Sequence, residues 1–242
     1  MTLPVDPHLQ NLQNLQFFIS SSYPCGYLEN RQAQSLIAAP HYLIDTEVYS
    51  ALIRLGFRRS GQHTYRPHCK NCSACVPVRL PVAELQPSRS QRRAWNRHQH
   101  LTTSILEPQL VEEHYALYRA YQHARHPEGG MDNDDVGQYR SFLTQSNVDT
   151  VLIEFREDDR LRMVSVVDCL TDGLSAVYTF YACSDPTASY GTYNVLWLAE
   201  WCRRMQLPHL YLGYWIENSP KMAYKKNFRP LQALIKGHWK NL

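Results

Sequence analysis

The stretch TVLIEFREDDRLRMVSVVDCLTDGLSAVYTFYAC, residues 150–183, decides the fold. It contains three apolar runs, at 150–156, 161–170 and 175–183, that are rich in Val, Leu, Tyr and Phe. β-Branched and aromatic residues in runs of this length favour strands, and the short polar segments between the runs are typical of turns. The stretch therefore predicts three consecutive strands.

The chain downstream extends this pattern. We expect a helix, a strand, a short helix and an extended segment, at 194–206, 209–214, 219–227 and 229–239. This order is that of a mixed α/β (α+β) fold like that of the N-acetyltransferases (the GNAT fold), although periodicity alone supports only the mixed class. We expect such a domain over residues 105–242, after a smaller cysteine-containing region over residues 1–100.

The N-terminal region has its own signals. Residues 29–39 are helix formers and predict a helix that Pro40 stops. Asp45 is a candidate cap for a second helix that ends near Gly56, and 57–66 predicts a hairpin. Three further elements are expected, a strand, a basic helix and a helix, at 76–80, 88–98 and 111–122.

Charge is distributed unevenly along the 242 residues. Residues 54–97 contain ten Lys or Arg and one acid, 107–172 contain fourteen acids and six Lys or Arg, and 203–240 contain eight Lys or Arg and one acid. Two basic blocks flanking an acidic segment indicate a surface that binds a polyanion. The alternative is an ordinary charged surface exposed to solvent. The chain has no apolar run of eighteen residues and no secretory leader pattern, so we expect a cytoplasmic protein without a membrane partner.

Four cysteines form the first candidate site. Cys69, Cys72 and Cys75 are separated by two residues each, and Cys25 lies upstream. Thiolates at this spacing can share one metal, and a closed zinc site needs four ligands. The four could hold a structural zinc ion or an iron–sulfur cluster, and the alternative is a cysteine-rich loop without metal.

Two aromatic stretches, 177–181 and 211–215, form the second. Strand alternation places Tyr178 and Phe180 on one face. Tyrosine hydroxyls can hydrogen-bond a substrate and rings can stack on an adenine, whereas ordinary strand packing is the alternative.

Basic side chains grouped at helical spacing form the third. Such groups suit phosphate contacts, whose hallmark is salt-dependent affinity, with a solvated helix face as the alternative. The candidates are Arg89, Arg92, Arg93, Arg97, Lys221 and Lys225.

Several of these segments together resemble the arginyl-tRNA–protein transferase family, and within it the bacterial aspartate/glutamate leucyltransferase branch. The matching N-terminal motifs are PCGYL at 24–28, GFRRSG at 56–61 and YRP at 65–67. The matching C-terminal motifs are VYTFY at 177–181, YLGYWI at 211–216, KMAYK at 221–225 and FRP at 228–230. They run in order over residues 23–239.

The resemblance implies an enzyme with leucyl-tRNA as donor and a protein beginning with Asp or Glu as acceptor. The added leucine would direct the acceptor to the degradation machinery of the N-degron route, and the chemistry would require no cofactor. Two departures stand out. Where the eukaryotic relatives carry a second cysteine, this chain has Leu28, and the acetyl-CoA phosphate loop is missing, since residues 189–192 keep a single glycine.

The chemistry that the resemblance implies needs few groups. The donor ester is already activated, so catalysis should rest on positioning the acceptor amine and stabilising the oxyanion. Asp168 is the candidate base, unless it only caps a turn, and Tyr178, Tyr181 and Tyr214 are candidates to position the donor or to donate to the oxyanion. An arginine should read the acceptor carboxylate, with Arg31, Arg58, Arg59 and Arg66 as candidates.

Three alternatives remain open at this point. The first is an arginyl donor with the same acceptors. The second is an acetyl-CoA-dependent N-acetyltransferase, and the third is a non-enzymatic, zinc-dependent nucleic-acid-binding module.

Overall fold

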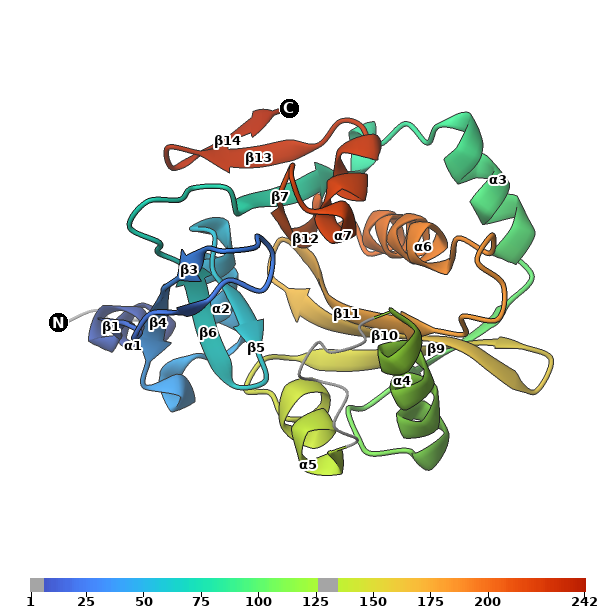
Figure 1. Cartoon of the computed structure of the whole chain (residues 1–242), viewed down its shortest axis with the longest axis horizontal. Helices are drawn as coiled ribbons and strands as arrows, with labels where there is room; N and C mark the ends of the chain where they lie inside the picture. The colour runs from blue at the N-terminus through green and yellow to red at the C-terminus, as the bar shows by residue number, and fades with distance from the viewer. Residues whose placement is uncertain (1–6, 126–134) are drawn as a thin grey trace, which may run out of the picture.

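An eight-stranded mixed sheet forms the centre of the computed structural model, which describes residues 7–125 and 135–242 (Figure 1). The strand order is β14-β13-β7-β12-β11-β10-β9-β8. In this order the strands span His238–Asn241, Gln232–Ile235, Val76–Pro81, His209–Trp215, Gly173–Tyr181, Arg160–Leu170, Thr150–Glu157 and Thr102–Leu106. Neighbours are antiparallel except for β11 and β12, which are parallel. The expected mixed α/β class is confirmed, as are the three strands of 150–183.

Helices cover both faces of this sheet (Figure 1). One face carries α6 (Tyr190–Arg204) and α3 (Arg89–His98), and the other carries α4 (Glu112–Arg125), α5 (Val136–Tyr139) and η3 (Arg140–Thr144). The alternation of strand β10 explains this layering, because Met163 and Val167 join the core under α6 while Val164 and Val166 join the core under α4. The sheet is therefore buried on both sides.

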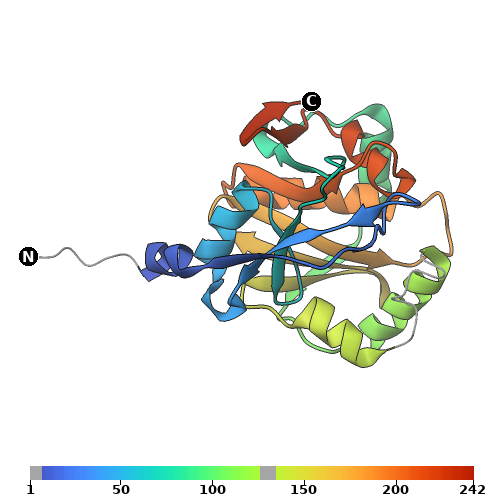
Figure 2. The same ribbon diagram turned by 60° about the vertical axis from the view of Figure 1, so that its left-hand side comes forward.

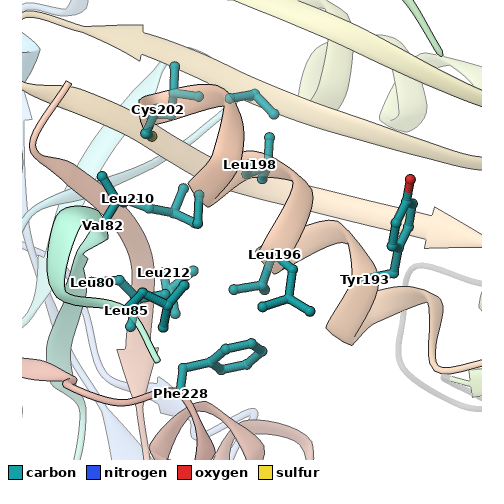
Figure 3. Close-up of a cluster of buried hydrophobic side chains, with 14 of the residues drawn as sticks. Leu80, Val82, Leu85, Tyr193, Leu196, Leu198, Cys202, Leu210, Leu212 and Phe228 are labelled. Atoms are coloured by element: carbon teal, nitrogen blue, oxygen red, sulfur yellow. The ribbon is translucent and has the colours of Figure 1, made fainter. Parts of the chain in front are cut away.

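The core under α6 joins distant parts of the chain (Figure 3). Leu80 of β7, Leu210 and Leu212 of β12, Leu196 of α6 and Phe228 are all buried in it. Burying a side chain of this size contributes about 1.5–3 kcal/mol. This core holds β7 between two C-terminal strands.

A second, four-stranded sheet is formed by the N-terminal residues, in the order β1-β4-β6-β5. Its strands span Gln16–Ile19, Ser35–Ala39, His63–Pro67 and Arg58–Ser60. The helices α1, η1 and α2 and the short strands β2 and β3 accompany it, at Pro7–Asn14, His41–Leu43, Thr46–Arg54, Tyr23–Pro24 and Gln32–Ala33. The α2 helix is capped by Asp45, whose carboxylate accepts a 2.9 Å hydrogen bond from Val48 N, as the sequence predicts.

The helix expected over 29–39 is wrong. This segment instead forms β3 and β4, and β4 pairs with β1 on one side and with β6 on the other. Ser35 and Ala38 are buried there. Pairing with two partner strands outweighs the weak helix propensity of the segment.

The N-terminal unit packs on the main sheet, and its blue and cyan elements lie over that sheet in Figure 2. Tyr49 and Leu52 of α2 share a core with Leu170 and Tyr211. The main sheet also runs across the division expected near residue 100, because β7 comes from the N-terminal segment. That division therefore stays a prediction.

Three short helices complete the description: η2 spans Val82–Glu84, α7 spans Pro220–Ala223 and η4 spans Tyr224–Asn227. Within the described ranges, no helix is long and apolar enough to cross a lipid bilayer.

Candidate functional site

A cleft of about 1540 Å³ opens where β11 and β12 separate. The two strands pair only over residues 173–175 and 209–211. Beyond this short ladder, Val177 to Thr179 of β11 and Leu212 to Tyr214 of β12 line the cleft instead of pairing with each other. Parallel strands that diverge at their carboxyl ends provide a natural ligand site.

A bulge in β12 shapes one wall. The pairing with β7 shifts register between Tyr211 and Tyr214, and Gly213 has a φ of +71°. Such a backbone conformation favours glycine, and a bulge re-aims the side chains beside it. The Tyr214 hydroxyl donates a 2.9 Å hydrogen bond to Gly56 O, so its ring is held against β5.

Arg58 lies on this wall. Its guanidinium carbon is 5.7 Å from the centre of the Tyr214 ring and 5.9 Å from the centre of the Tyr65 ring. The aromatic faces attract the cation, and Tyr27 also hydrogen-bonds it. The guanidinium is thus held by neutral aromatic groups.

Lys225 of η4 is buried on the same wall, with 7% of its surface exposed. Its Nζ donates a 2.6 Å hydrogen bond to Tyr214 O and lies 3.3 Å from Met222 Sδ. Burial, and after it the charge of Arg58, lower the pKa of Lys225 to about 7. This ammonium can therefore lose its proton near neutral pH.

Tyrosines line the part of the cleft formed by β11 and α4. Gln122 Nε2 donates a 3.0 Å hydrogen bond to the Tyr178 hydroxyl, which leaves that hydroxyl hydrogen free to be donated. Burial raises the pKa of Tyr178, so its hydroxyl stays protonated at neutral pH. The Tyr181 ring packs 4.9 Å from that of Tyr121 and 5.8 Å from that of Tyr190.

Two buried amide oxygens lie among these rings. Asn194 Nδ2 donates a 2.9 Å hydrogen bond to Thr179 Oγ1. Neither Asn194 Oδ1 nor Gln122 Oε1 accepts a hydrogen bond from any described residue, although both are buried. Buried polar atoms without a partner are costly, so these oxygens are suited to accept N–H groups from a ligand.

Asp168 does not line this cleft. Its side chain is 0% exposed, and Arg59 contacts both carboxylate oxygens, with Nε 2.8 Å from Oδ2 and the terminal Nη2 2.5 Å from Oδ1. The Thr150 hydroxyl adds a 2.8 Å hydrogen bond to Oδ1. A buried carboxylate that is paired with a guanidinium and lies outside the cleft lining cannot meet an acceptor amine, so we do not carry Asp168 forward as the base. The three tyrosines named from the sequence do line the cleft.

The four arginines expected to read the acceptor are placed differently. Arg31, Arg58 and Arg59 all contribute to the cleft lining, but the Arg59 guanidinium is buried in its ion pair with Asp168. Arg66 donates to Leu55 O at 3.2 Å and lies over the Phe57 ring, outside the lining of the cleft.

The basic residues expected to bind tRNA divide into two groups. The four arginines of α3 are exposed on one helix, outside the cleft lining. Arg92 donates to Pro87 O, and Arg97 pairs with Asp185. Lys221 is exposed at the cleft and Lys225 is buried in it, so the two do not present one solvated face.

The four cysteines come together at the edge of the cleft. Burial, and then the neighbouring Cys25, Cys69 and Cys72 thiols, raise the pKa of Cys75 to about 12. The Cys69 thiol is directed at Gln34 O, 3.7 Å away. In the part of the chain that the structure describes, no three His, Cys, Asp or Glu side chains are arranged to hold a metal ion. The metal site expected from these four cysteines therefore stays a prediction, and no step of the chemistry below passes through one.

Sequence reasoning missed three groups that line the cleft: Tyr121, Gln122 and Asn194. Tyr121 lies in the helix that the sequence predicts over residues 111–122, without a functional role. The sequence around Gln122 and Asn194 gives no sign of a ligand site, because the role of each side chain depends on the strand against which its helix packs.

Two family models match the chain. "Arginine-tRNA-protein transferase, N terminus" matches residues 23–93, and "Arginine-tRNA-protein transferase, C terminus" matches residues 113–235. Both matched segments contribute side chains to the cleft.

Curated relatives cover nearly the whole chain. The aspartate/glutamate leucyltransferase of Methylobacillus flagellatus is 59% identical, over 99% of this chain and 96% of the relative. Those of Nitrosospira multiformis and Hahella chejuensis are 58% and 43% identical, over 94% and 96% of this chain and 91% and 99% of each relative.

Similarity to solved structures is weak. L-PGS from Bacillus licheniformis aligns with a TM-score of 0.45 at 11% identity, over 86% of this chain and 70% of that chain. The C-terminal domain of a putative lysylphosphatidylglycerol synthetase from Agrobacterium fabrum gives 0.42 at 10% identity, over 59% of this chain and 47% of that chain. These values carry no argument about function.

Proposed function

The chain belongs to the arginine-tRNA-protein transferase family, and from this premise we propose that it transfers leucine from leucyl-tRNA to the N-terminal Asp or Glu of an acceptor protein. The acceptor α-amine attacks the ester carbonyl of the donor, an amide bond forms, and the ester C–O bond breaks. The leaving group is the terminal hydroxyl of the tRNA, and the amine gives up a proton. The product is a substrate for the degradation machinery of the cytoplasm.

The cleft between β11 and β12 is the observation that carries this proposal. It is large enough for a terminal nucleotide and two amino-acid residues, and both segments that match the family line it. The strand order and the single parallel pair, which separates after three residues, support a GNAT-like arrangement of this domain.

The donor end is placed by three features of the cleft. The aromatic rings of Tyr121, Tyr178 and Tyr181 provide an apolar surface for the leucine side chain. The free oxygens of Gln122 and Asn194 can accept hydrogen bonds from the leucine amino group. These groups belong to α4, β11 and α6.

The first turn of α6 suits the tRNA end. Residues 189–192 line the cleft, and no side chain of the described residues caps this helix. Free N–H groups at a helix N-terminus favour an anion such as a phosphate. The exposed arginines of α3, a helix that packs against α6, are our proposed docking face for the body of the tRNA.

The oxyanion can be stabilised by Tyr178. Its hydroxyl hydrogen is free, since the oxygen accepts from Gln122, and its raised pKa keeps that hydrogen in place. Tyr214 has a different role, because its hydroxyl already donates to Gly56 O. We assign it to positioning Arg58 and Lys225.

A direct assay tests the reaction. The purified protein is incubated with labelled leucyl-tRNA, and separately with arginyl-tRNA, together with peptides that begin with Glu, Asp, Gln or Lys. We expect leucine on the Glu and Asp peptides alone. Transfer of arginine would leave the family assignment standing but would make arginyl-tRNA the donor. Transfer from neither tRNA would contradict the proposal.

A further inference from the structure

Two cations meet at one residue of the cleft wall. The Arg58 guanidinium lies over the ring of Tyr214, and the Lys225 ammonium bonds the backbone oxygen of the same residue. The two charges are close enough for Arg58 to act on the titration of Lys225. Gly213 brings the β12 backbone to Arg58, since a side chain built there would lie 3.9 Å from Arg58 Nη1.

No acid of the described part of the chain balances this pair. Among residues 7–125 and 135–242, no carboxylate forms a salt bridge with Arg58 or Lys225. Their polar neighbours are instead the neutral Tyr27, Tyr65 and Tyr214. Arg59, the next residue along β5, shows the contrast, because it is buried and paired with Asp168, whereas Arg58 is half-buried and has no acid partner among the described residues.

Unpaired buried charges are costly, and protein folds rarely keep them without a partner. Lys225 is buried and Arg58 beside it is half-buried. Two cations without an acid partner among the described residues, at the wall of an open cleft, indicate that a bound ligand supplies the missing negative charge. Two anions take part in the proposed reaction: the side-chain carboxylate of the acceptor and the phosphodiester near the end of the tRNA.

We propose that Arg58 and Lys225 together bind the side-chain carboxylate of the acceptor's N-terminal Asp or Glu, and so determine acceptor specificity. This assignment rests on the proposed function. The planar guanidinium can hold both carboxylate oxygens, and the ammonium adds a point charge. The pair belongs to β5 and η4, whereas the donor groups belong to α4, β11 and α6, which leaves the phosphodiester to the α6 end of the cleft.

The neutral analogue explains why this site discriminates. An acceptor that begins with Gln has the shape of Glu without its charge, so both cations would stay without an anionic partner. Sites that hydrogen-bond a charged group reject a neutral analogue because their own groups lose a partner. Preference for Glu over Gln therefore reports on this pair of residues.

The decisive variant is Lys225→Met, which keeps an unbranched side chain of nearly the same volume, one heavy atom shorter, without its charge. Transfer is measured with peptides that differ only in a first residue of Glu or Gln, at saturating leucyl-tRNA. A charge-assisted hydrogen bond contributes about 1.5–3 kcal/mol, so we expect the Glu-to-Gln ratio of kcat/KM to fall about 10- to 100-fold. Lys226→Met is the matched control, because Lys226 is exposed beside it and outside the cleft lining, and its ratio should match that of the unaltered protein.

The unaltered protein gives a second measurement that needs no variant. The groups that face Lys225 are Arg58 and Tyr214, and with a pKa near 7 the ammonium is lost as pH rises. The Glu-to-Gln ratio should therefore fall between about pH 6 and pH 8.5. Titration of the acceptor α-amine is common to both peptides and cancels in the ratio.

Different outcomes overturn the assignment in different ways. An equal loss on the Glu and Gln peptides would make Lys225 a base or a structural residue. A loss of leucyl-tRNA affinity with an unchanged Glu-to-Gln ratio would mean that Arg58 and Lys225 bind a phosphodiester of the tRNA. If the unaltered protein transfers nothing, the proposed function fails. Calorimetric binding of the Glu and Gln peptides to the unaltered protein and to Lys225→Met then still tests the carboxylate site, which equal affinities would exclude.

Discussion

At the residue scale, the Arg59–Asp168 pair shows how burial determines the role of an acid. The side chains are 2% and 0% exposed, and removing one partner leaves a buried charge alone. We expect Asp168→Asn to lower the free energy of unfolding by about 3–5 kcal/mol, as measured by urea denaturation, while single-turnover transfer by the folded protein stays within about threefold. The double variant Arg59→Met/Asp168→Leu should lose less, because it leaves no charge unpaired. A 100-fold slower transfer at unchanged stability would instead restore Asp168 as the base.

At the element scale, the short parallel ladder between β11 and β12 determines where the cleft opens, and Gly173 begins that ladder. A Cβ at Gly173 would lie 2.3 Å from His209 O, so β12 would have to move away. We expect Gly173→Ala to lower the free energy of unfolding by about 1–3 kcal/mol in thermal or urea denaturation. The matched control is Gly26→Ala, because a Cβ there meets nothing within 4 Å, and its change should stay within about 0.5 kcal/mol. Similar losses in both variants would show that the close approach does not matter.

At the scale of the whole molecule, β7 links the N-terminal and C-terminal parts of the chain in one sheet. It lies between β12 and β13, and Val78, Leu80 and Val82 join the core under α6. A fragment of residues 105–242 would lack this strand and expose its neighbours. We therefore expect the fragment to show no cooperative thermal transition by circular dichroism. A cooperative transition accompanied by leucine transfer would prove that the C-terminal segment is an independent domain.

Local chemistry predicted much of the fold. The strands of 150–183 follow from runs of β-branched and aromatic residues, and α2 follows from Asp45 as its cap. These features depend on residues within a few positions of one another, so the sequence carries them directly.

Sequence patterns were enough to predict the family and the mixed α/β class, and they named Tyr178, Tyr181 and Tyr214, which line the cleft. Only the tertiary structure decided that Arg59 serves Asp168, 109 residues away, while its neighbour Arg58 faces the cleft beside Lys225. The tertiary structure likewise determines that the segment 29–39 forms β3 and β4, and that β7 belongs to the main sheet. Burial and pairing depend on which distant segments meet. Adjacent residues of a strand point to opposite faces, so the roles of two neighbouring arginines differ only once other segments pack against each face.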